Sequence, residues 1–242
     1  MATGRVHSWD LSTGVDGPGT RFVLFLNGCP LRCLYCANPD TRYMRDGVPT
    51  TVDEVMVQIE RHRAFITTAG GGVTLTGGEP LLQHAFTAEV FHRCRELGLH
   101  TALDTSGFLG AAADQDLLAD TSLVLLDIKS FDISTYRRLT GQSLLPTLSF
   151  AGRLARLGVP VWIRYVLVPG WTDDPAAVEG LAVFLSTLAN VERVDVLPFH
   201  KLGSSKYQAL GITFPLSDTP VPDEAMVSRV RGQFRDHGLR AY

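Results

Sequence analysis

The chain has 242 residues, of which 45% are apolar and 19% charged, enough to bury a sizeable core and too apolar for a disordered chain. The formal net charge of −3 excludes the strongly basic surface expected of a nucleic-acid-binding protein. The amino-terminal segment lacks the apolar stretch of a secretion signal, and no apolar run approaches the roughly 20 residues that span a bilayer. The sequence therefore predicts a cytoplasmic protein that binds neither nucleic acid nor membrane.

Short β-branched runs bounded by Gly, Pro or polar residues predict six strands. They begin near Arg21, Gly72, His100, Leu123, Val161 and Val194. Helical periodicity predicts helices over Thr51–Thr67, Ala85–Leu97, Ser134–Leu139, Leu148–Leu157, Pro175–Ala189 and Asp223–His237. Strand followed by helix, repeated six times, indicates an α/β protein with a parallel sheet, either open and doubly wound or closed as a barrel. Only Leu202–Pro222, rich in Gly and Pro, lacks a clear period and is expected to be a long surface loop.

Three of the four cysteines, Cys29, Cys33 and Cys36, form a Cys-x3-Cys-x2-Cys motif after the first strand. A disulfide framework is disfavoured, because so short a loop would be strained and the chain carries no secretion signal. Three thiolates on one loop can hold a 4Fe-4S cluster whose fourth iron stays open to another ligand, for example an amine and a carboxylate. The alternative is a zinc site in a non-catalytic interaction module. Cys94 lies on an apolar helical stripe and is expected to be buried and inert.

A second motif, Gly77-Gly78-Glu79, comes at the end of the second predicted strand. Two glycines there allow a polar ligand to approach the backbone closely, although a simple tight turn from strand to helix would use the same residues.

Other polar residues follow the remaining strands, and the carboxyl ends of parallel strands form one face on which function is built. They are Asp104, Thr105 and Ser106, then Asp127 and Lys129, and finally His200. Asp127 and Lys129 interrupt an apolar strand end, so each must be paired with the other or with a ligand. The side chain of Arg164 either points into the barrel, where it would contact a ligand, or points outward, and the period of the strand does not decide between the two.

These motifs together resemble the radical S-adenosylmethionine (SAM) superfamily, in which an aromatic residue, here Tyr35, precedes the last cysteine. Within it, the sequence is similar to the pyruvate formate-lyase-activating enzymes over nearly its whole length. The segments that carry the resemblance are GRVHS, VDGPGTRF, NGCPLRCLYCANPDT, GGGVTLTGGEP, HTALDTSGF, LVLLDIK, VWIRYVLVPGWTDD and LPFHKLG.

The resemblance implies a partial (β/α)6 barrel of the TIM-like, radical SAM type. Residues 1–242 would form a single core domain with a short N-terminal extension and a C-terminal loop and helix. An auxiliary ferredoxin-like insert is not expected, because Cys94 is the one cysteine left outside the motif. We expect a monomer.

The same resemblance assigns residues to each ligand. A 4Fe-4S cluster would be held by Cys29, Cys33 and Cys36. SAM would be bound by Tyr35, Cys36, Ala37, Gly77, Gly78, Glu79, Asp104, Asp127, Ile128, Lys129, Arg164 and His200. A monovalent cation would be bound by Asp104, Thr105 and Asp127, and the substrate peptide would lie near Asp16 and Asn38.

The implied activity is that of an oxidoreductase working under anaerobic conditions. The reduced cluster cleaves SAM to methionine and a 5′-deoxyadenosyl radical, which takes a hydrogen atom from a glycine of the partner enzyme, pyruvate formate-lyase. Flavodoxin or ferredoxin would supply the electron. Activation of another glycyl radical enzyme, or radical chemistry on a small molecule, would use the same cluster and SAM residues. We expect the loop at Leu202–Pro222, together with Asp16 and Asn38, to border the opening that admits the partner.

Overall fold

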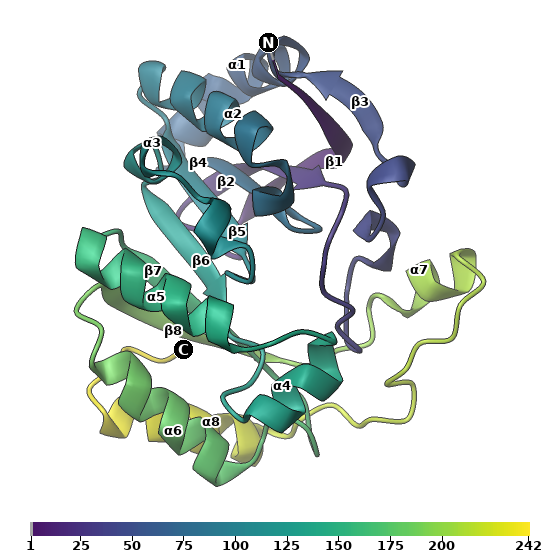
Figure 1. The fold of residues 1–242 in the computed structure, drawn as a ribbon, viewed down its shortest axis with the longest axis vertical. Helices are drawn as coiled ribbons and strands as arrows, with labels where there is room; N and C mark the ends of the chain where they lie inside the picture. Colours follow the sequence, from purple (N-terminus) through teal and green to yellow (C-terminus); the bar gives the residue numbers. More distant parts are fainter. Residues whose placement is uncertain (1) are drawn as a thin grey trace. The chain divides into compact units, whose positions relative to one another are not determined.

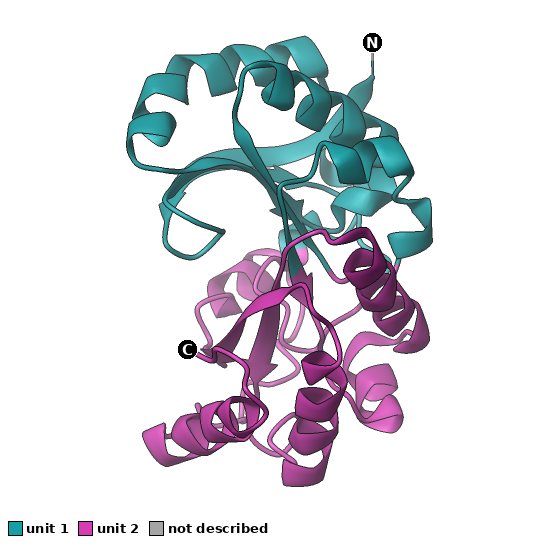
Figure 2. Cartoon of the chain, turned by 90° about the vertical axis from the view of Figure 1, so that its left-hand side faces the viewer, with its two compact units in different colours: residues 1–30, 40–105, 109–125 teal, residues 31–39, 106–108, 126–242 magenta. Residues whose placement is uncertain are grey.

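The computed structural model describes residues 2–242, which form two compact units (Figure 2). Unit 1 comprises the chain up to Pro30, together with Asp40–Thr105 and Leu109–Leu125. Unit 2 comprises Leu31–Pro39, Ser106–Phe108 and Leu126–Tyr242.

Unit 1 contains a mixed sheet with the strand order β3-β1-β2-β4-β5. Its strands are β1 (Thr3–Thr13), β2 (Thr20–Leu26), β3 (Val48–Thr51), β4 (Gly72–Gly77) and β5 (His100–Thr105). Strand β1 pairs antiparallel with both β2 and β3, whereas β2, β4 and β5 pair in parallel. The parallel strands confirm the predicted repeats, but β1 and β3 were not expected from the sequence.

The helices of unit 1 pack against this sheet and against one another (Figure 1). They are α1 (Val52–Thr68), α2 (His84–Glu96) and α3 (Gln115–Ala119), with short 3-10 turns η1 (Pro39–Thr41), η2 (Met44–Asp46), η3 (Pro80–Gln83) and η4 (Gly110–Ala112). The predicted capping box is present: the Thr51 hydroxyl accepts from the Glu54 backbone N–H, and the Glu54 carboxylate accepts from that of Thr51. Helix α1 contacts β2 and β4, so its apolar stripe is buried as predicted.

Unit 2 contains the parallel pair β7 (Val161–Leu167) and β8 (Val191–Pro198), joined by α6 (Pro175–Ser186). Its other helices are α4 (Ile133–Thr140), α5 (Leu145–Leu157), α7 (Ser204–Ala209) and α8 (Glu224–Asp236). Helix α8 packs on α6 and β8. Strand β6 (Leu123–Asp127) leaves unit 1 at Leu125 and enters unit 2 at Leu126.

The six predicted strands are all present, as β2 and β4 to β8, and the α/β class is confirmed. Within the described residues, β3 and β8 each pair with one neighbouring strand, so the strands form a partial barrel and not a closed one. No helix in this part of the chain has both the length and the apolar character needed to cross a membrane.

The segment 202–222 is exposed over most of its length, as expected of a surface loop, but part of it differs from that prediction. It contains α7, and the side chains of Tyr207, Phe214 and Leu216 are buried in an apolar cluster. The apolar residues Leu210 and Ile212 lie between Tyr207 and Phe214 but are exposed, so no helical or strand period in the sequence reveals which apolar residues are buried.

Candidate functional site

The backbone before Cys29 is anchored on both sides. Gly28 donates its N–H to the Thr41 carbonyl at 2.7 Å, and Cys29 donates to the Arg42 carbonyl at 3.0 Å. Gly28 has a φ of +97°, a conformation that side chains disfavour. The half-buried Cys29 thiol is therefore carried by a backbone fixed to the segment that follows the cysteine motif.

The Gly77-Gly78-Glu79 turn lies directly against that backbone. Gly78 donates to the Leu26 carbonyl at 2.7 Å, and Glu79 donates to the Gly28 carbonyl at 2.8 Å. A Cβ at Gly78 would come within 2.2 Å of the same Gly28 oxygen, and Gly77 has a φ of +108°. The motif therefore forms a tight turn beside the segment that leads into the first cysteine, and the binding of a ligand by this turn stays a prediction.

The Glu79 side chain is fully buried and held by the end of β5. The Thr105 hydroxyl donates to Glu79 Oε1 at 2.6 Å, and the Leu81 backbone N–H donates to the same oxygen at 3.3 Å. One residue earlier, Asp104 Oδ2 accepts a 2.6 Å hydrogen bond from the Thr76 hydroxyl of β4. The predicted residues Glu79 and Thr105 are thus paired directly, and Asp104 is paired with Thr76, which the sequence did not single out.

Asp16 belongs to a loop that folds over the sheet. Its backbone carbonyl accepts from the Thr74 hydroxyl at 2.7 Å, and Thr74 Oγ1 also accepts from Nε of Arg21 at 2.9 Å. The Arg21 side chain is fully buried, and burial lowers its pKa to about 10, although the nearby Asp16 carboxylate opposes the shift. Arg21 was not singled out from the sequence, because its hydrogen bond to Thr74 joins residues of two different strands.

The loop with the other two cysteines is fixed to the end of α4. The backbone N–H groups of Arg32 and Leu34 donate to the carbonyls of Thr140 and Leu139 at 2.8 and 3.0 Å. Cys36 donates to the Cys33 carbonyl at 3.2 Å, which closes a turn between the two half-buried thiols.

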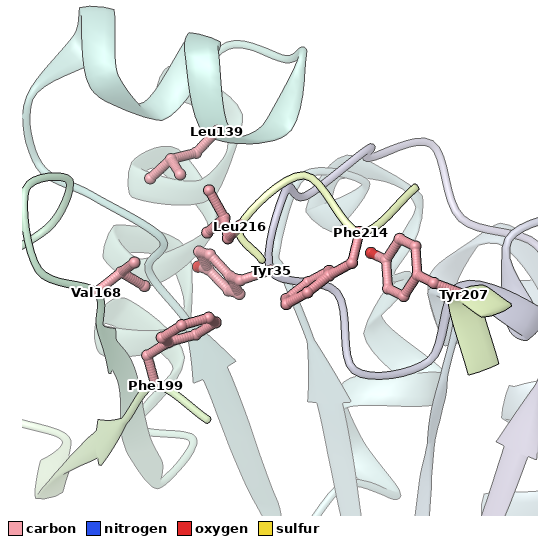
Figure 3. Close-up of a cluster of buried hydrophobic side chains, with 7 residues drawn as sticks. All are labelled: Tyr35, Leu139, Val168, Phe199, Tyr207, Phe214 and Leu216. Carbon is pink, nitrogen blue, oxygen red and sulfur yellow. The ribbon is translucent and has the colours of Figure 1, made fainter. Parts of the chain in front are cut away.

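The ring of Tyr35, between these cysteines, is buried in a cluster with six other apolar side chains (Figure 3). They are Leu139, Val168, Phe199, Tyr207, Phe214 and Leu216. Burial raises the pKa of Tyr35 well above its usual value, so the phenol stays protonated. The aromatic residue of the motif therefore serves to pack the cysteine loop into unit 2.

Asp127 and Lys129 form an ion pair with a distance of 2.7 Å between Oδ2 and Nζ. The ammonium lies 5.8 Å from the centre of the Tyr35 ring. Burial alone would lower the pKa of Lys129, but the Asp127 carboxylate, with smaller contributions from Tyr35 and Cys33, outweighs it and raises this pKa well above the usual value. Lys129 therefore stays protonated and positively charged near neutral pH.

The remaining predicted residues of unit 2 differ in exposure. Ile128 is fully buried, and its N–H donates to the Arg164 carbonyl at 3.2 Å. Arg164 lies on the same face of β7 as Val166, a residue that packs against the Tyr35 cluster, and a contact of Arg164 with a ligand stays a prediction. Ala37 and His200 are exposed, and His200 Nδ1 accepts from the Leu202 N–H at 3.3 Å.

The thiols of the motif suit an iron-sulfur cluster in their chemistry. All four cysteines of the chain are free, and the three of the motif are half-buried whereas Cys94 is buried. Among the described residues, no three His, Cys, Asp or Glu side chains surround a single metal-ion position.

Comparison with known proteins adds the deciding observation. Residues 23–179 match the model of the radical SAM superfamily. The pyruvate formate-lyase 1-activating enzyme of Escherichia coli (strain K12) is 41% identical to this chain, and the alignment covers 97% of this chain and 96% of the Escherichia coli enzyme. The pyruvate formate-lyase-activating enzyme of Staphylococcus aureus (strain USA300) is 44% identical over 94% of this chain and 93% of its own.

This chain belongs to the radical SAM superfamily, in the family of pyruvate formate-lyase-activating enzymes. The family resemblance drawn from the sequence is confirmed. Membership in the radical SAM superfamily implies a 4Fe-4S cluster and SAM as cofactors.

Solved structures agree with the radical SAM fold. A domain of pyruvate formate-lyase-activating enzyme from Bacteroides vulgatus superposes with a TM-score of 0.61 at 27% identity, covering 71% of this chain and 98% of that domain. A radical SAM methyltransferase from Sphaerobacter thermophilus superposes with a TM-score of 0.66 at 18% identity, and the match covers 100% of this chain and 76% of the methyltransferase chain. At that identity the second likeness concerns the fold alone.

Proposed function

We propose that this chain activates pyruvate formate-lyase by generating a glycyl radical on that enzyme under anaerobic conditions, as an oxidoreductase. The observation that carries the proposal is the near full-length identity of 41% and 44% to pyruvate formate-lyase-activating enzymes. The alignments cover more than nine-tenths of both chains, so the likeness extends well beyond the cysteine motif.

Cys29, Cys33 and Cys36 would hold the cluster. When bound and reduced, the cluster and SAM together supply the 5′-deoxyadenosyl radical that takes a hydrogen atom from the partner glycine. The chain's own residues hold the thiols in place: Cys29 through the backbone pairing of residues 28–29 with 41–42, and the other two through the Tyr35 cluster and α4.

SAM would be bound by residues at or after the carboxyl ends of the strands, together with Arg164 within β7. We assign them as Tyr35, Cys36, Ala37, Gly77, Gly78, Glu79, Asp104, Asp127, Ile128, Lys129, Arg164 and His200. Glu79 suits the amino group of SAM, because a buried carboxylate held by Thr105 has little freedom to turn away. Lys129 keeps its proton beside Asp127 and can therefore only donate hydrogen bonds, which suits a carboxylate acceptor.

A monovalent cation would use the oxygen atoms of Asp104, Thr105 and Asp127. Carboxylate and hydroxyl oxygens are the ligands that hard cations prefer. The substrate peptide would contact Asp16 and Asn38, and flavodoxin or ferredoxin would supply the electron.

We propose that the chain acts as a monomer with a single radical SAM core, with no auxiliary ferredoxin-like insert. A reducing compartment such as the cytoplasm fits the free state of all four cysteines.

The test is anaerobic incubation of the iron-reconstituted protein with SAM, a low-potential reductant and pyruvate formate-lyase, monitored by electron paramagnetic resonance. A glycyl radical signal on pyruvate formate-lyase supports the proposal. Cys33→Ala should abolish the signal, whereas Cys94→Ala, a matched cysteine outside the motif, should keep it. Absence of the signal from protein that holds its cluster and cleaves SAM would refute the assignment of this partner.

A further inference from the structure

The segments on either side of the cysteine motif, residues 27–29 and residues 40–43, are hydrogen-bonded to each other within unit 1. The backbone N–H groups of Gly28 and Cys29 donate to the second and third carbonyls of residues 40–43. The loop that carries the three thiols of the motif is therefore closed at its base by paired backbone.

The side chain of Asn27 extends this pairing to the first and last of the four carbonyls. Its NH2 group donates to the carbonyl of Asp40 at 3.2 Å and to that of Tyr43 at 3.3 Å. Both N–H bonds of the amide are used, so these two partners fix its orientation. One side chain thus holds both ends of the segment whose middle is held by backbone bonds.

Asn27 is itself held through its backbone groups. Its N–H donates to the Arg5 carbonyl at 2.9 Å, and its carbonyl accepts from Gln83 Nε2 at 2.8 Å. The Gln83 amide also pairs with both backbone groups of Arg5, donating at 2.9 Å and accepting at 2.6 Å. The Asn27 side chain therefore projects from a backbone that is fixed on both sides.

The burial of Asn27 shows that its donated bonds matter. The residue has no exposure to solvent, and its Oδ1 atom has no hydrogen-bond partner among the described residues. Burying an amide oxygen without a partner costs free energy, which an apolar side chain at this position would avoid. The two bonds to the carbonyls of Asp40 and Tyr43 are what an amide offers here in return.

We propose that Asn27 is a positioning residue that keeps the base of the cysteine loop closed, so that Cys29 stays in place to hold the 4Fe-4S cluster. The proposal rests on the proposed function, in which Cys29 is a cluster ligand. Without the two side-chain bonds, residues 40–43 separate from residues 27–29 more often, and the Cys29 thiol loses its fixed position.

The first readout uses metal-free protein and so does not depend on the cluster. Hydrogen exchange at the backbone amides of Gly28 and Cys29 reports how often the base of the loop opens. Asn27→Leu keeps a similar side-chain volume but has no donor. Exchange at these two amides should become about tenfold faster in this variant, as expected for the loss of two long hydrogen bonds. Mass spectrometry of short peptides that contain residues 28–29 measures the rate.

The second readout uses the iron-reconstituted protein. Its cluster is challenged anaerobically with an excess of a ferrous-iron chelator, and the release of iron is followed by absorbance. Asn27→Leu should release its iron about tenfold faster than the unmodified protein, because the Cys29 thiol is held less firmly. Asn27→Ala removes the same two donors without adding an apolar branch, and it should give the same two results if the leucine variant does not fold.

Asn190→Leu is the matched control. Asn190 Nδ2 donates to the Val159 carbonyl at 2.7 Å, and its Oδ1 atom also has no hydrogen-bond partner among the described residues. The amide therefore resembles that of Asn27 but bonds a segment outside the cysteine motif. This variant should leave exchange at residues 28–29 and the release of iron unchanged. Urea denaturation of each variant measures any general loss of stability.

The proposal is overturned if the Asn27 variants match Asn190→Leu in exchange at residues 28–29 or in the release of iron. Equal acceleration of exchange throughout unit 1 would also overturn it, because Asn27 would then stabilise the fold in general and not the base of the loop. Unmodified protein that holds no cluster would overturn this proposal together with the proposed function. Protein that shows both predicted effects but forms no radical on pyruvate formate-lyase would refute the proposed function alone.

Discussion

The hydroxyl of Thr105 donates a 2.6 Å hydrogen bond to the carboxylate of Glu79, which has no exposure to solvent. Removing this donor with Thr105→Val keeps the side-chain shape but leaves a buried carboxylate with one partner fewer. We expect the free energy of unfolding to fall by about 1–3 kcal/mol, measured by urea denaturation. Thr105→Ser retains the hydroxyl and should cost clearly less. Equal losses in the two variants would mean that packing, and not the hydrogen bond, governs stability here.

We expect His100 to make the folded protein less stable in acid. Burial, and to a smaller extent the neighbouring Arg21 guanidinium, lowers the pKa of His100 to about 4, against about 6.5 in the unfolded chain. Between these two pH values the unfolded state takes up a proton and the folded state does not. As far as His100 is concerned, the free energy of unfolding therefore has its full value above pH 6.5 and decreases as the pH falls toward 4.

His100→Gln should remove this contribution. Between pH 7 and pH 4.5 the unmodified protein should lose roughly 1–2 kcal/mol more than the variant, with an allowance for the partial access of water to the ring. Denaturation series at both pH values measure the difference. A variant with the same acid sensitivity as the unmodified protein would show that His100 titrates normally in the folded state.

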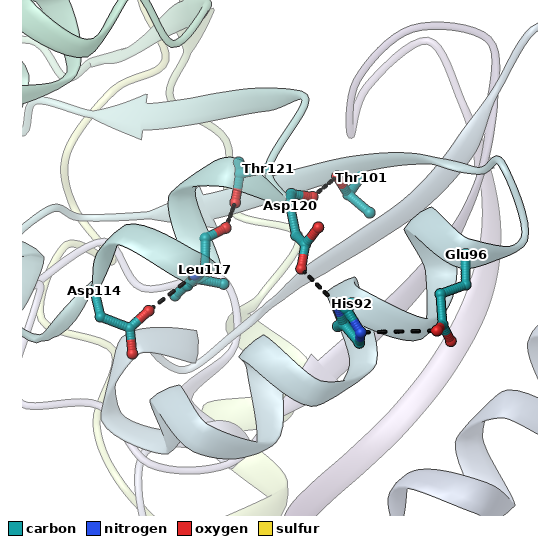
Figure 4. A network of polar contacts seen from close by, with 7 residues as sticks. All are labelled: His92, Glu96, Thr101, Asp114, Leu117, Asp120 and Thr121. Atoms are coloured by element: carbon teal, nitrogen blue, oxygen red, sulfur yellow. Dashed lines mark hydrogen bonds and ion pairs between the residues drawn. The ribbon is translucent and has the colours of Figure 1, made fainter.

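His92 is expected to stabilise the fold at lower pH, the opposite of His100. The Nδ1 atom of His92 lies 3.0 Å from Asp120 Oδ2 (Figure 4). This hydrogen bond, aided by the charges of Asp120, Glu96 and Asp116, raises the pKa of His92. The contribution of the pair is therefore present below about pH 6.5 and is lost as the pH rises through the raised pKa. His92→Gln and Asp120→Asn should both flatten the fall in stability between pH 6 and pH 8.5. If only one of them does so, the two side chains do not act as a pair.

Cys94 should differ sharply from the cysteines of the motif in reactivity. Burial raises the pKa of Cys94 to about 12, although Arg21 and Arg93 oppose the shift, so its thiol stays protonated near neutral pH. Anaerobic alkylation of the folded, metal-free protein should label Cys29, Cys33 and Cys36, and Cys94 should react only after unfolding. Mass spectrometry of peptides identifies the labelled positions. Rapid labelling of Cys94 in the folded protein would contradict its buried state.

Elements that rest on a local pattern were predictable from the sequence. The apolar runs of β4 and β6 are buried on both faces as parallel strands require, and the capping box at Thr51 and Glu54 begins α1 where it was expected. Strand β1 was missed because it alternates irregularly and leaves most of its residues partly or fully exposed. Its pairing with β2 and β3 provides the stability that its own composition does not indicate.

The candidate site was likewise predictable only in part. The cysteine spacing and the position of Glu79, Asp104 and Lys129 at strand ends can be recognised in the sequence. Thr76, which donates to Asp104 from the neighbouring strand, could not be singled out from the sequence, and neither could the bond from Arg21 to Thr74. Such contacts depend on register and packing, which no local period encodes.

Under the proposed function, this chain removes a hydrogen atom from a glycine of pyruvate formate-lyase. The most direct measurement uses a peptide of that enzyme deuterated at the glycine α-carbon, incubated anaerobically with the reduced, reconstituted protein and SAM, followed by mass spectrometry of the 5′-deoxyadenosine formed. We predict 5′-deoxyadenosine that carries a single deuterium. Unlabelled 5′-deoxyadenosine from a peptide that is bound would contradict the claim.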